Sequence, residues 1–189
     1  EEVFERLSGK VIRIEGDMAT IAYPSEDFSL EVGGVPQILS VIAGNLFGLE
    51  ALKGVRLEDV TFPRSMVQEF PGPKLGIDGL RGLLRRPEMP LVGTIVKPKI
   101  GLSPLKTADY IREAGLGGLT NSKDDETLVD QAFCPMEERV PAIAEAIDSV
   151  RGETGHRMIH AINISTRCDR IVEVGERVQE LGGTQIMVD

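Results

Sequence analysis

The sequence predicts an α/β protein in which a small α+β unit precedes a parallel sheet. After Pro90, short apolar runs alternate with amphipathic helical runs, and strand–helix units of roughly 25 to 35 residues are typical of a parallel sheet. Before that point, two β-rich runs flank a glycine-containing turn, as in an antiparallel hairpin. The alternation alone fits either a doubly wound sheet or a (β/α)8 barrel.

The first 70 residues are the expected α+β unit. β-forming residues dominate two short runs on either side of Glu15-Gly16-Asp17, and apolar residues at helical spacing follow. The elements predicted here are strands over 11–14 and 18–23, a helix over 36–49 and a strand over 57–62.

Residues 71–90 are the predicted linker between the two parts, because glycine and proline recur throughout this stretch. A short helix over 77–84 is expected inside it. The elements predicted after the linker are strands over 91–96, 118–123, 158–164 and 185–188, and helices over 107–114, 137–150 and 169–181.

Composition and charge exclude several partners. Hydrophobic residues make up 41% of the chain and the net charge is −9, so neither nucleic acid nor an anionic membrane is expected. No apolar stretch approaches the roughly 20 residues of a membrane span, and the N-terminus lacks signal-peptide features. The two cysteines, Cys134 and Cys168, are expected to be reduced thiols of a cytoplasmic protein. The absence of a G-x-G-x-x-G or P-loop motif disfavours a dinucleotide or P-loop site.

The first candidate cluster is Lys97-Pro98-Lys99, at the predicted end of the strand over 91–96. Residues i and i+2 of a strand share a face, so both ammonium groups are expected to point the same way. Two close like charges favour a neutral amine, and such a pair can move protons or hold phosphate and carboxylate oxygens. On spacing alone, two solvated lysines in a turn are the commoner interpretation.

The second candidate cluster is Lys123-Asp124-Asp125-Glu126, which follows the strand over 118–123. Alternation places Lys123 and Asp125 on one face and Asp124 on the other, and the chain can turn Glu126 inward. Mg²⁺ prefers such oxygen ligands and usually takes one or two carboxylates. Unmodified, Lys123 is only a counter-ion, whereas a carbamate formed with CO2 is a third oxygen ligand. Taken alone, the run also fits a solvated charged loop.

Both clusters follow neighbouring parallel strands, at the edge where α/β barrels build their active sites. Asn163 and Asp189, near the ends of the next two strands, either line the same mouth or make structural hydrogen bonds. His156 and His160 have no partners at zinc-ligand spacing, so no zinc site is expected. The cysteines lack an obvious histidine partner, so a thiol nucleophile is not expected either.

Four blocks of the sequence resemble the large subunit of ribulose-1,5-bisphosphate carboxylase/oxygenase (RuBisCO), and they stand in the family's order. The blocks are residues 43–48 and 56–60, similar to the family's N-terminal domain, residues 93–103, similar to its first barrel strand, and residues 117–126, similar to its metal-site signature. Residues 72–77 and 133–139 look closer to the archaeal (form III) branch than to the plant branch.

The resemblance implies a fold. Residues 1–70 would be part of the family's α+β N-terminal domain, 71–90 a linker, and 91–189 the first half, about four strands, of a (β/α)8 TIM barrel. It also implies a homodimer or higher homo-oligomer with shared active sites, in which Asn45 reaches from the N-terminal domain of one subunit into the barrel of its partner.

The resemblance also implies a role for each site residue. Lys97 would move protons at the enediol of the substrate, and Lys99 would orient and support that enediol. Lys123 would carry the activating carbamate, with Asp125 and Glu126 binding Mg²⁺ beside it.

The activity implied is Mg²⁺-dependent carboxylation of ribulose 1,5-bisphosphate by CO2 to give 3-phosphoglycerate. RuBisCO-like proteins that enolise or isomerise other sugar phosphates are an alternative. Retention of both Lys97 and Lys99 favours a carboxylase, because the second lysine is often lost in the look-alikes. The chain departs from the family at Thr120-Asn121-Ser122, where many members read Asp-Phe-Thr or similar. The family's mobile-loop lysine, later histidines and glycine-rich phosphate sites have no counterpart here, so a third expectation is a piece that is inactive alone.

Overall fold

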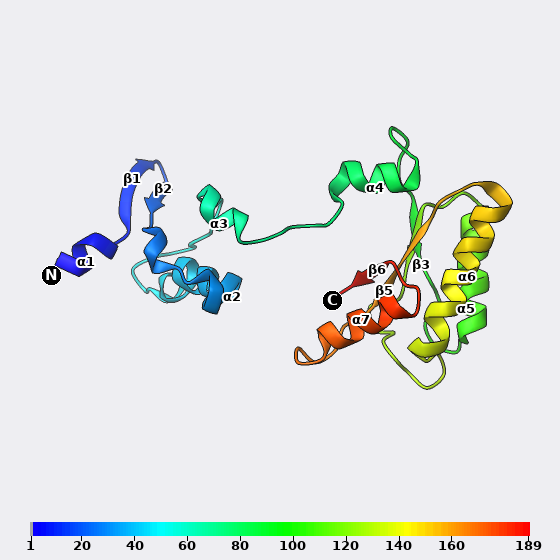
Figure 1. The fold of residues 1–189 in the computed structure, drawn as a ribbon. Coiled ribbons are helices and arrows are strands. Elements are labelled where there is room, and N and C mark those ends of the chain that lie inside the picture. The colour runs from blue at the N-terminus through cyan, green and yellow to red at the C-terminus, as the bar shows by residue number, and fades with distance from the viewer. Residues whose placement is uncertain (1) are drawn as a thin grey trace. The chain divides into compact units, whose positions relative to one another are not determined.

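The computed structural model describes residues 2–189, except for the side chains of Glu2 and Asn45. The chain divides between Lys74 and Leu75 into two compact units (Figure 1). The first unit holds a hairpin and short helices, and the second holds a parallel sheet with its helices.

The first unit contains an antiparallel hairpin, as predicted. Strands β1 and β2 pair, and Gly16 between them has a φ of 58°, which glycine adopts without steric cost. The elements are α1 (Glu2–Leu7), β1 (Lys10–Glu15), β2 (Met18–Ala22), η1 (Ser25–Asp27), α2 (Leu30–Ala43), η2 (Asn45–Gly48) and α3 (Arg64–Gln68).

Two predictions for this unit need correction. The strand expected over 57–62 is wrong, because these residues are irregular and, among the residues described for this unit, the sheet consists of β1 and β2. The helix expected over 36–49 begins earlier, at Leu30, and is kinked at Gly34, whose φ is 54°. It then gives way to the separate 3-10 turn η2.

The expectation that no apolar stretch approaches the length of a membrane span is wrong for Leu30–Gly48. This 19-residue segment is long and apolar enough by length and composition. A single segment of this kind is weak support for a span, and its helix is kinked at Gly34, two residues before Pro36.

The second unit alternates strand and helix, as predicted. Its four strands form one parallel sheet in the order β3-β4-β5-β6 (Figure 1). The elements are α4 (Gly76–Leu84), β3 (Gly93–Ile95), α5 (Pro104–Leu116), β4 (Asn121–Lys123), α6 (Met136–Thr154), β5 (Ile159–Asn163), α7 (Ile171–Glu180) and β6 (Gln185–Met187).

Local sequence explains where these helices begin and end. Ser103 caps α5, because its Oγ accepts a hydrogen bond from the Lys106 amide at 3.3 Å and Pro104 occupies the first turn. Gly182, with a φ of 95°, follows α7 and allows the chain to reverse toward β6.

The two faces of the sheet carry different side chains. Ser122, His160 and Ile162 are buried, and the last two lie against α6 residues such as Val140. On the opposite face, one residue from each strand lies in register across the sheet: Ile95, Lys123, Ala161 and Gln185. The sheet therefore separates a buried face beneath the helices from a face that carries Lys123.

The core of the second unit lies between the sheet and its helices. Helices α5 and α6 pack side by side, and α7 contributes Val178 to the same cluster (Figure 1). The central members are almost fully buried: Ile111, Val140, Ile143, Val150, Ile162, Ile164 and Val178. Burial of this much aliphatic surface holds the strands in place, and with them the segments that leave the sheet.

Candidate active site at the carboxyl edge of the sheet

The segments after β3 and β4 leave the sheet at the same edge. The Val96 amide donates to the Lys123 carbonyl at 3.1 Å, and the Asp124 amide donates to the Ala161 carbonyl at 3.0 Å. These bonds extend the parallel ladder just past the strands. The two charged clusters predicted from sequence therefore emerge next to each other.

The structure brings both lysines of the first cluster to the second. Lys97 Nζ donates to Asp125 Oδ2, and Lys99 Nζ donates to the hydroxyl of Thr127. Strand alternation is not the reason, because β3 ends at Ile95 and both lysines lie beyond it. They converge because both reach for oxygen acceptors of one short segment, Asp125 to Thr127.

The ion pair between Lys97 and Asp125 favours the charged form of both side chains. A hydrogen bond from Lys97, followed by bonds from the hydroxyl and amide of Thr127, holds the pKa of Asp125 well below its usual range, although the carboxyl is buried. The same bond to Asp125 raises the pKa of Lys97. The expectation that the lysine pair favours a neutral amine is therefore wrong for Lys97, because the carboxylate outweighs the neighbouring lysine.

Lys123 and Glu126 form the second ion pair of the site. Lys123 Nζ donates to Glu126 Oε1, and this bond lowers the pKa of Glu126. Lys123 Nζ also lies 3.6 Å from the sulfur of Met187, on the same face of the sheet. Two carboxylates and three ammonium groups thus meet at this edge, and each carboxylate is paired with one of the lysines.

Asp124 points away from these groups, as alternation predicts. It is fully buried and contacts Arg139 of α6 and His160 of β5. Asn163, also fully buried, makes hydrogen bonds to the backbone of the segment after β4. Asp189 is exposed, and its amide donates to Ser165 Oγ at 2.8 Å.

The donor set fits Mg²⁺. Asp125 and Glu126 are ionised and supply hard oxygen atoms, and Mg²⁺ typically takes one or two carboxylates and keeps several waters. Lys123 Nζ already contacts Glu126, so a carbamate on that nitrogen would add oxygen atoms beside the same carboxylate. Within residues 2–189, no group of three or more His, Cys, Asp or Glu side chains is arranged to hold a metal without such help.

Sequence reasoning missed Thr127, which contacts the site, and Arg139, which contacts Asp124. Thr127 accepts from Lys99 and donates its hydroxyl to Asp125 Oδ1 at 2.6 Å. The Asp-x-Thr spacing, typical of a turn closed by an Asp side chain, could have revealed it. Arg139, on the buried side of α6, carries no such local signal. Asn45 begins η2, but its side chain lies outside the described residues, so its contact with a partner subunit stays a prediction.

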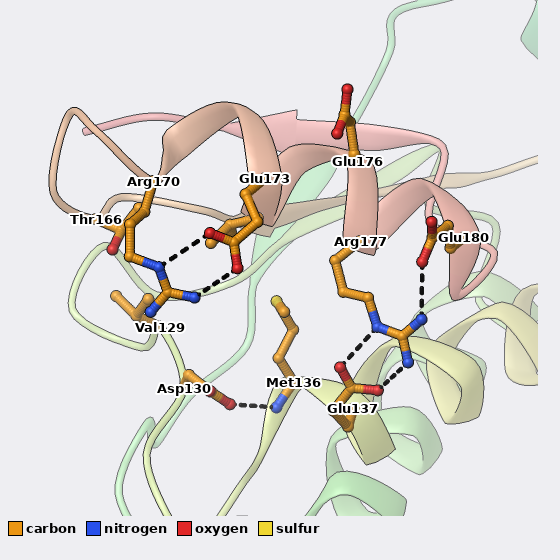
Figure 2. Close-up of a pocket in the computed structure, with 11 residues that line it drawn as sticks. Val129, Asp130, Met136, Glu137, Thr166, Arg170, Glu173, Glu176, Arg177 and Glu180 are labelled. Carbon is orange, nitrogen blue, oxygen red and sulfur yellow. Dashed lines mark hydrogen bonds and ion pairs between the residues drawn. The ribbon is translucent and has the colours of Figure 1, made fainter.

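A surface hollow of about 410 Å³ between α6 and α7 is a poor candidate for a bisphosphate site (Figure 2). Its two arginines are already paired within the hollow. Arg177 bonds Glu137 and Glu180, and Arg170 bonds Glu173. Because carboxylates outnumber arginines among the lining residues, the hollow would repel an anionic ligand.

Comparison with known proteins places both units in one family. Residues 76–189 match the ribulose bisphosphate carboxylase large chain, catalytic domain, and residues 1–66 match the N-terminal domain of the same chain. The ribulose bisphosphate carboxylase of Methanosarcina acetivorans is 36% identical over 189 residues, which cover all of this chain and 44% of that protein. Octameric RuBisCO from Pyrococcus horikoshii has a TM-score of 0.90 at 35% identity, covering 100% of this chain and 46% of that one.

A relative named for a different activity also matches. The 3-oxo-isoapionate-4-phosphate transcarboxylase/hydrolase of Xanthobacter autotrophicus is 38% identical over 168 residues, which cover 89% of this chain and 40% of that protein. The chain spans less than half the length of each of these proteins. The likeness confirms the expected fold, part of a (β/α)8 barrel after part of an α+β domain, and the archaeal relatives agree with the branch that the sequence indicated.

Proposed function

Because the chain belongs to the ribulose bisphosphate carboxylase large-chain family, we propose that the protein is a Mg²⁺-dependent carboxylase. It would add CO2 to the enediol of ribulose 1,5-bisphosphate and, with one water molecule, cleave the six-carbon product to two molecules of 3-phosphoglycerate. The observation that carries the proposal is the convergence of Lys97 and Lys99 on the segment that begins at Asp125, beside the Lys123–Glu126 pair.

Lys123 is the proposed activation site. Its unprotonated Nζ attacks CO2, an N–C bond forms, and the proton lost from nitrogen passes to solvent, leaving a carbamate. The side chain then changes from a cation to an anion. Glu126, now paired with the Lys123 ammonium, gains an anionic neighbour, and two like charges favour capture of a divalent cation between them.

The remaining residues bind the cation and the substrate. Asp125 and Glu126 would hold Mg²⁺, which when bound supplies Lewis-acid polarisation of substrate oxygens. The Lys97 side chain is 58% exposed, so its ammonium can reach a substrate and move protons at the enediol. Lys99 would support the same oxygens as a fixed cation.

The complete site is proposed to lie between two copies of the protein. Asn45 of the N-terminal unit would contribute to the barrel site of a partner, which requires at least a homodimer. The octameric assembly of the Pyrococcus horikoshii RuBisCO supports a homo-oligomer.

A RuBisCO-like enolase or isomerase of another sugar phosphate is the second candidate. The Xanthobacter autotrophicus relative, named for a different reaction, supports it. Both candidates use the same carboxylates and Lys97 for enolisation. The presence of Lys99 beside Thr127 favours carboxylation, because the look-alikes often lack this lysine.

An assay of the full-length protein separates the candidates. With Mg²⁺, labelled CO2 and ribulose 1,5-bisphosphate, we expect label in 3-phosphoglycerate. Lys123→Ala should abolish both Mg²⁺-dependent CO2 trapping and product, whereas Lys106→Ala, an exposed lysine of α5, should change neither. CO2 trapping that persists in Lys123→Ala would contradict the activation site. Conversion of a sugar phosphate without incorporation of label would instead favour the second candidate.

A further inference from the structure

A cluster of buried polar side chains lies behind the two proposed metal ligands. We call it the buried polar cluster, and each of its members is at most 2% exposed. Its members come from the β4 region, α6 and β5: Ser122, Asp124, Arg139, His160 and Asn163. Buried charges are rare unless hydrogen bonds and opposite charges compensate them, so the function of this cluster needs an explanation.

Asp124 lies at the centre of the cluster. Its Oδ2 accepts hydrogen bonds from Arg139 Nη2 at 3.3 Å and from the backbone N–H of Asn163 at 3.1 Å. Its Oδ1 lies 3.1 Å from His160 Nε2. Because a carboxylate only accepts, the proton of His160 must be on Nε2. Its Nδ1 then accepts from Ser122 Oγ at 2.8 Å when the ring is neutral.

Two members of the cluster also hold the backbone that carries the ligands. Asn163 Nδ2 donates to the carbonyl oxygens of Asp125 at 3.3 Å and Glu126 at 2.7 Å. Arg139 donates to the carbonyls of Cys134 at 2.6 Å and Val129 at 2.7 Å. The segment between β4 and α6 is therefore held by hydrogen bonds to four of its backbone carbonyls.

We propose that Arg139, His160 and Asn163 are positioning residues that fix the backbone at Asp125 and Glu126 so that both carboxylates face one divalent cation. The inference rests on the proposed function and deepens it. Loss of a group that holds metal ligands from behind typically weakens metal affinity by about 10–100-fold. A chain segment without regular structure would otherwise have to be ordered by the cation itself, which weakens binding.

The competing explanation is that the cluster only joins β4, β5 and α6. In that case, substitutions in the buried polar cluster would lower the thermal stability of the protein and would leave the metal affinity of the folded molecules unchanged. Metal affinity and unfolding temperature, measured on the same variants, therefore separate positioning from simple support.

The test uses the full-length protein with Mn²⁺ in place of Mg²⁺. Electron paramagnetic resonance of free Mn²⁺, at fixed bicarbonate, gives the dissociation constant, and circular dichroism gives the unfolding temperature. We expect Asn163→Ala and His160→Leu to weaken Mn²⁺ binding about ten-fold or more. His160→Gln, which can keep an N–H toward Asp124, should recover most of the affinity.

Two further variants serve as references. Arg177→Met removes two exposed ion pairs, to Glu137 of α6 and Glu180 of α7, that lie outside the buried polar cluster, and it should leave the Mn²⁺ affinity unchanged. Asp125→Asn removes a proposed ligand and should abolish the binding. Arg139→Met leaves Asp124 without its cation and can fail to fold, so the uncharged Asn163→Ala variant decides the question.

The outcomes distinguish the inference from the proposed function. If Asn163→Ala and His160→Leu are folded and bind Mn²⁺ like the unaltered protein, the cluster is only structural and the inference is wrong. If the unaltered protein binds no Mn²⁺, or binds it independently of Asp125, the metal site itself is wrong and the inference falls with it. Weaker binding in both variants, with recovery in His160→Gln, supports positioning.

Discussion

At the scale of single residues, each proposed metal ligand is paired with a lysine of its own. Asp125 bonds Lys97, and Glu126 bonds Lys123. Each ion pair favours the ionised form of its carboxyl group, and the charges of the two pairs together cancel. A divalent cation that binds the proposed ligands would therefore displace ammonium groups from the carboxylates, and not protons. The proposed carbamate on Lys123 would remove the ion pair with Glu126, and CO2 binding would in this way be coupled to metal binding.

Thr127 offers a test at this scale. Its hydroxyl donates to Asp125 and accepts from Lys99. Thr127→Val should therefore remove one hydrogen bond from each group and leave Asp125 its bonds from Lys97 and from the Thr127 backbone amide. We expect the variant to bind Mn²⁺ several-fold more weakly, because a hydrogen bond to a charged group contributes about 1.5–3 kcal/mol when buried and less at an exposed residue such as this one. Thr127→Ser keeps the hydroxyl and should bind normally. Equal affinities in the two variants would show that the hydroxyl has no such role.

The placement of the charged side chains could be predicted from sequence more fully than the residues that support them. Short spacings within Lys123–Glu126 and strand alternation were enough to separate Asp124 from its neighbours. Arg139 could not be found in this way, because its contact with Asp124 joins a helix to a strand end and has no signature in local spacing. The charge state of Lys97 also depended on a partner 28 residues away.

At the scale of helices and strands, α5 packs so closely against α6 that Gly115 leaves no room for a larger side chain. A Cβ atom at Gly115 would lie 2.4 Å from Met158 Sδ and 2.9 Å from Val150 Cγ2. We expect Gly115→Val to cost about 1–3 kcal/mol through overpacking. Gly152→Ala on α6, where a Cβ meets nothing within 4 Å, should stabilise the protein by roughly 0.5–1 kcal/mol. Urea unfolding of the two variants measures both effects, and equal midpoints would contradict the crowding at Gly115.

An ion pair between α6 and α7 predicts a dependence on pH. Arg177 donates to both oxygens of Glu137 and lowers the pKa of that carboxyl from its ordinary value of 4.5 (Figure 2). A carboxyl with a lowered pKa in the folded state stabilises that state above its ordinary pKa, and the contribution is lost as the pH falls through the lowered value. Glu137→Gln should therefore lower the unfolding temperature slightly at pH 7, with a difference that shrinks toward pH 3. A difference that stays constant over this range would exclude a charge effect.

Helices and strands could be predicted where the local sequence determines them. They were harder to predict where they depend on pairing with a segment that is distant in the chain. The hairpin at Gly16 and the strand–helix alternation after Pro90 follow from local patterns, and the structure confirms them. The apolar residues over 57–62 resembled a strand, but a strand exists only with a partner to share its hydrogen bonds. None is available in the described unit, so these residues are irregular.

At the scale of the whole molecule, the parallel sheet has two open edges. Strands β3 and β6 each pair on one side only within the described residues. Exposed apolar side chains such as Ile186 and Val188 lie at one of them. Open edges of this kind invite pairing with other chains, and a closed barrel removes them.

The 189 residues expressed alone are therefore expected to associate and to lack carboxylase activity. Size-exclusion chromatography should show association, and the labelled-CO2 assay should show no 3-phosphoglycerate. The full-length protein, assayed in parallel, is the control. A monodisperse monomer, or product from the 189 residues, would contradict this expectation.

The division of the Lys123–Glu126 run between two faces of the sheet also matters to protein engineering. A designer who grafts these four residues onto another barrel transfers the two proposed metal-binding carboxylates together with Asp124, a buried acid that is paired here with a fully buried arginine and a histidine. Without counterparts of Arg139 and His160 at matching places, the graft would bury an unmatched negative charge beside the new centre. The smallest segment that could be transferred is thus β4, α6 and β5 together, because the four residues alone lack the partners of Asp124.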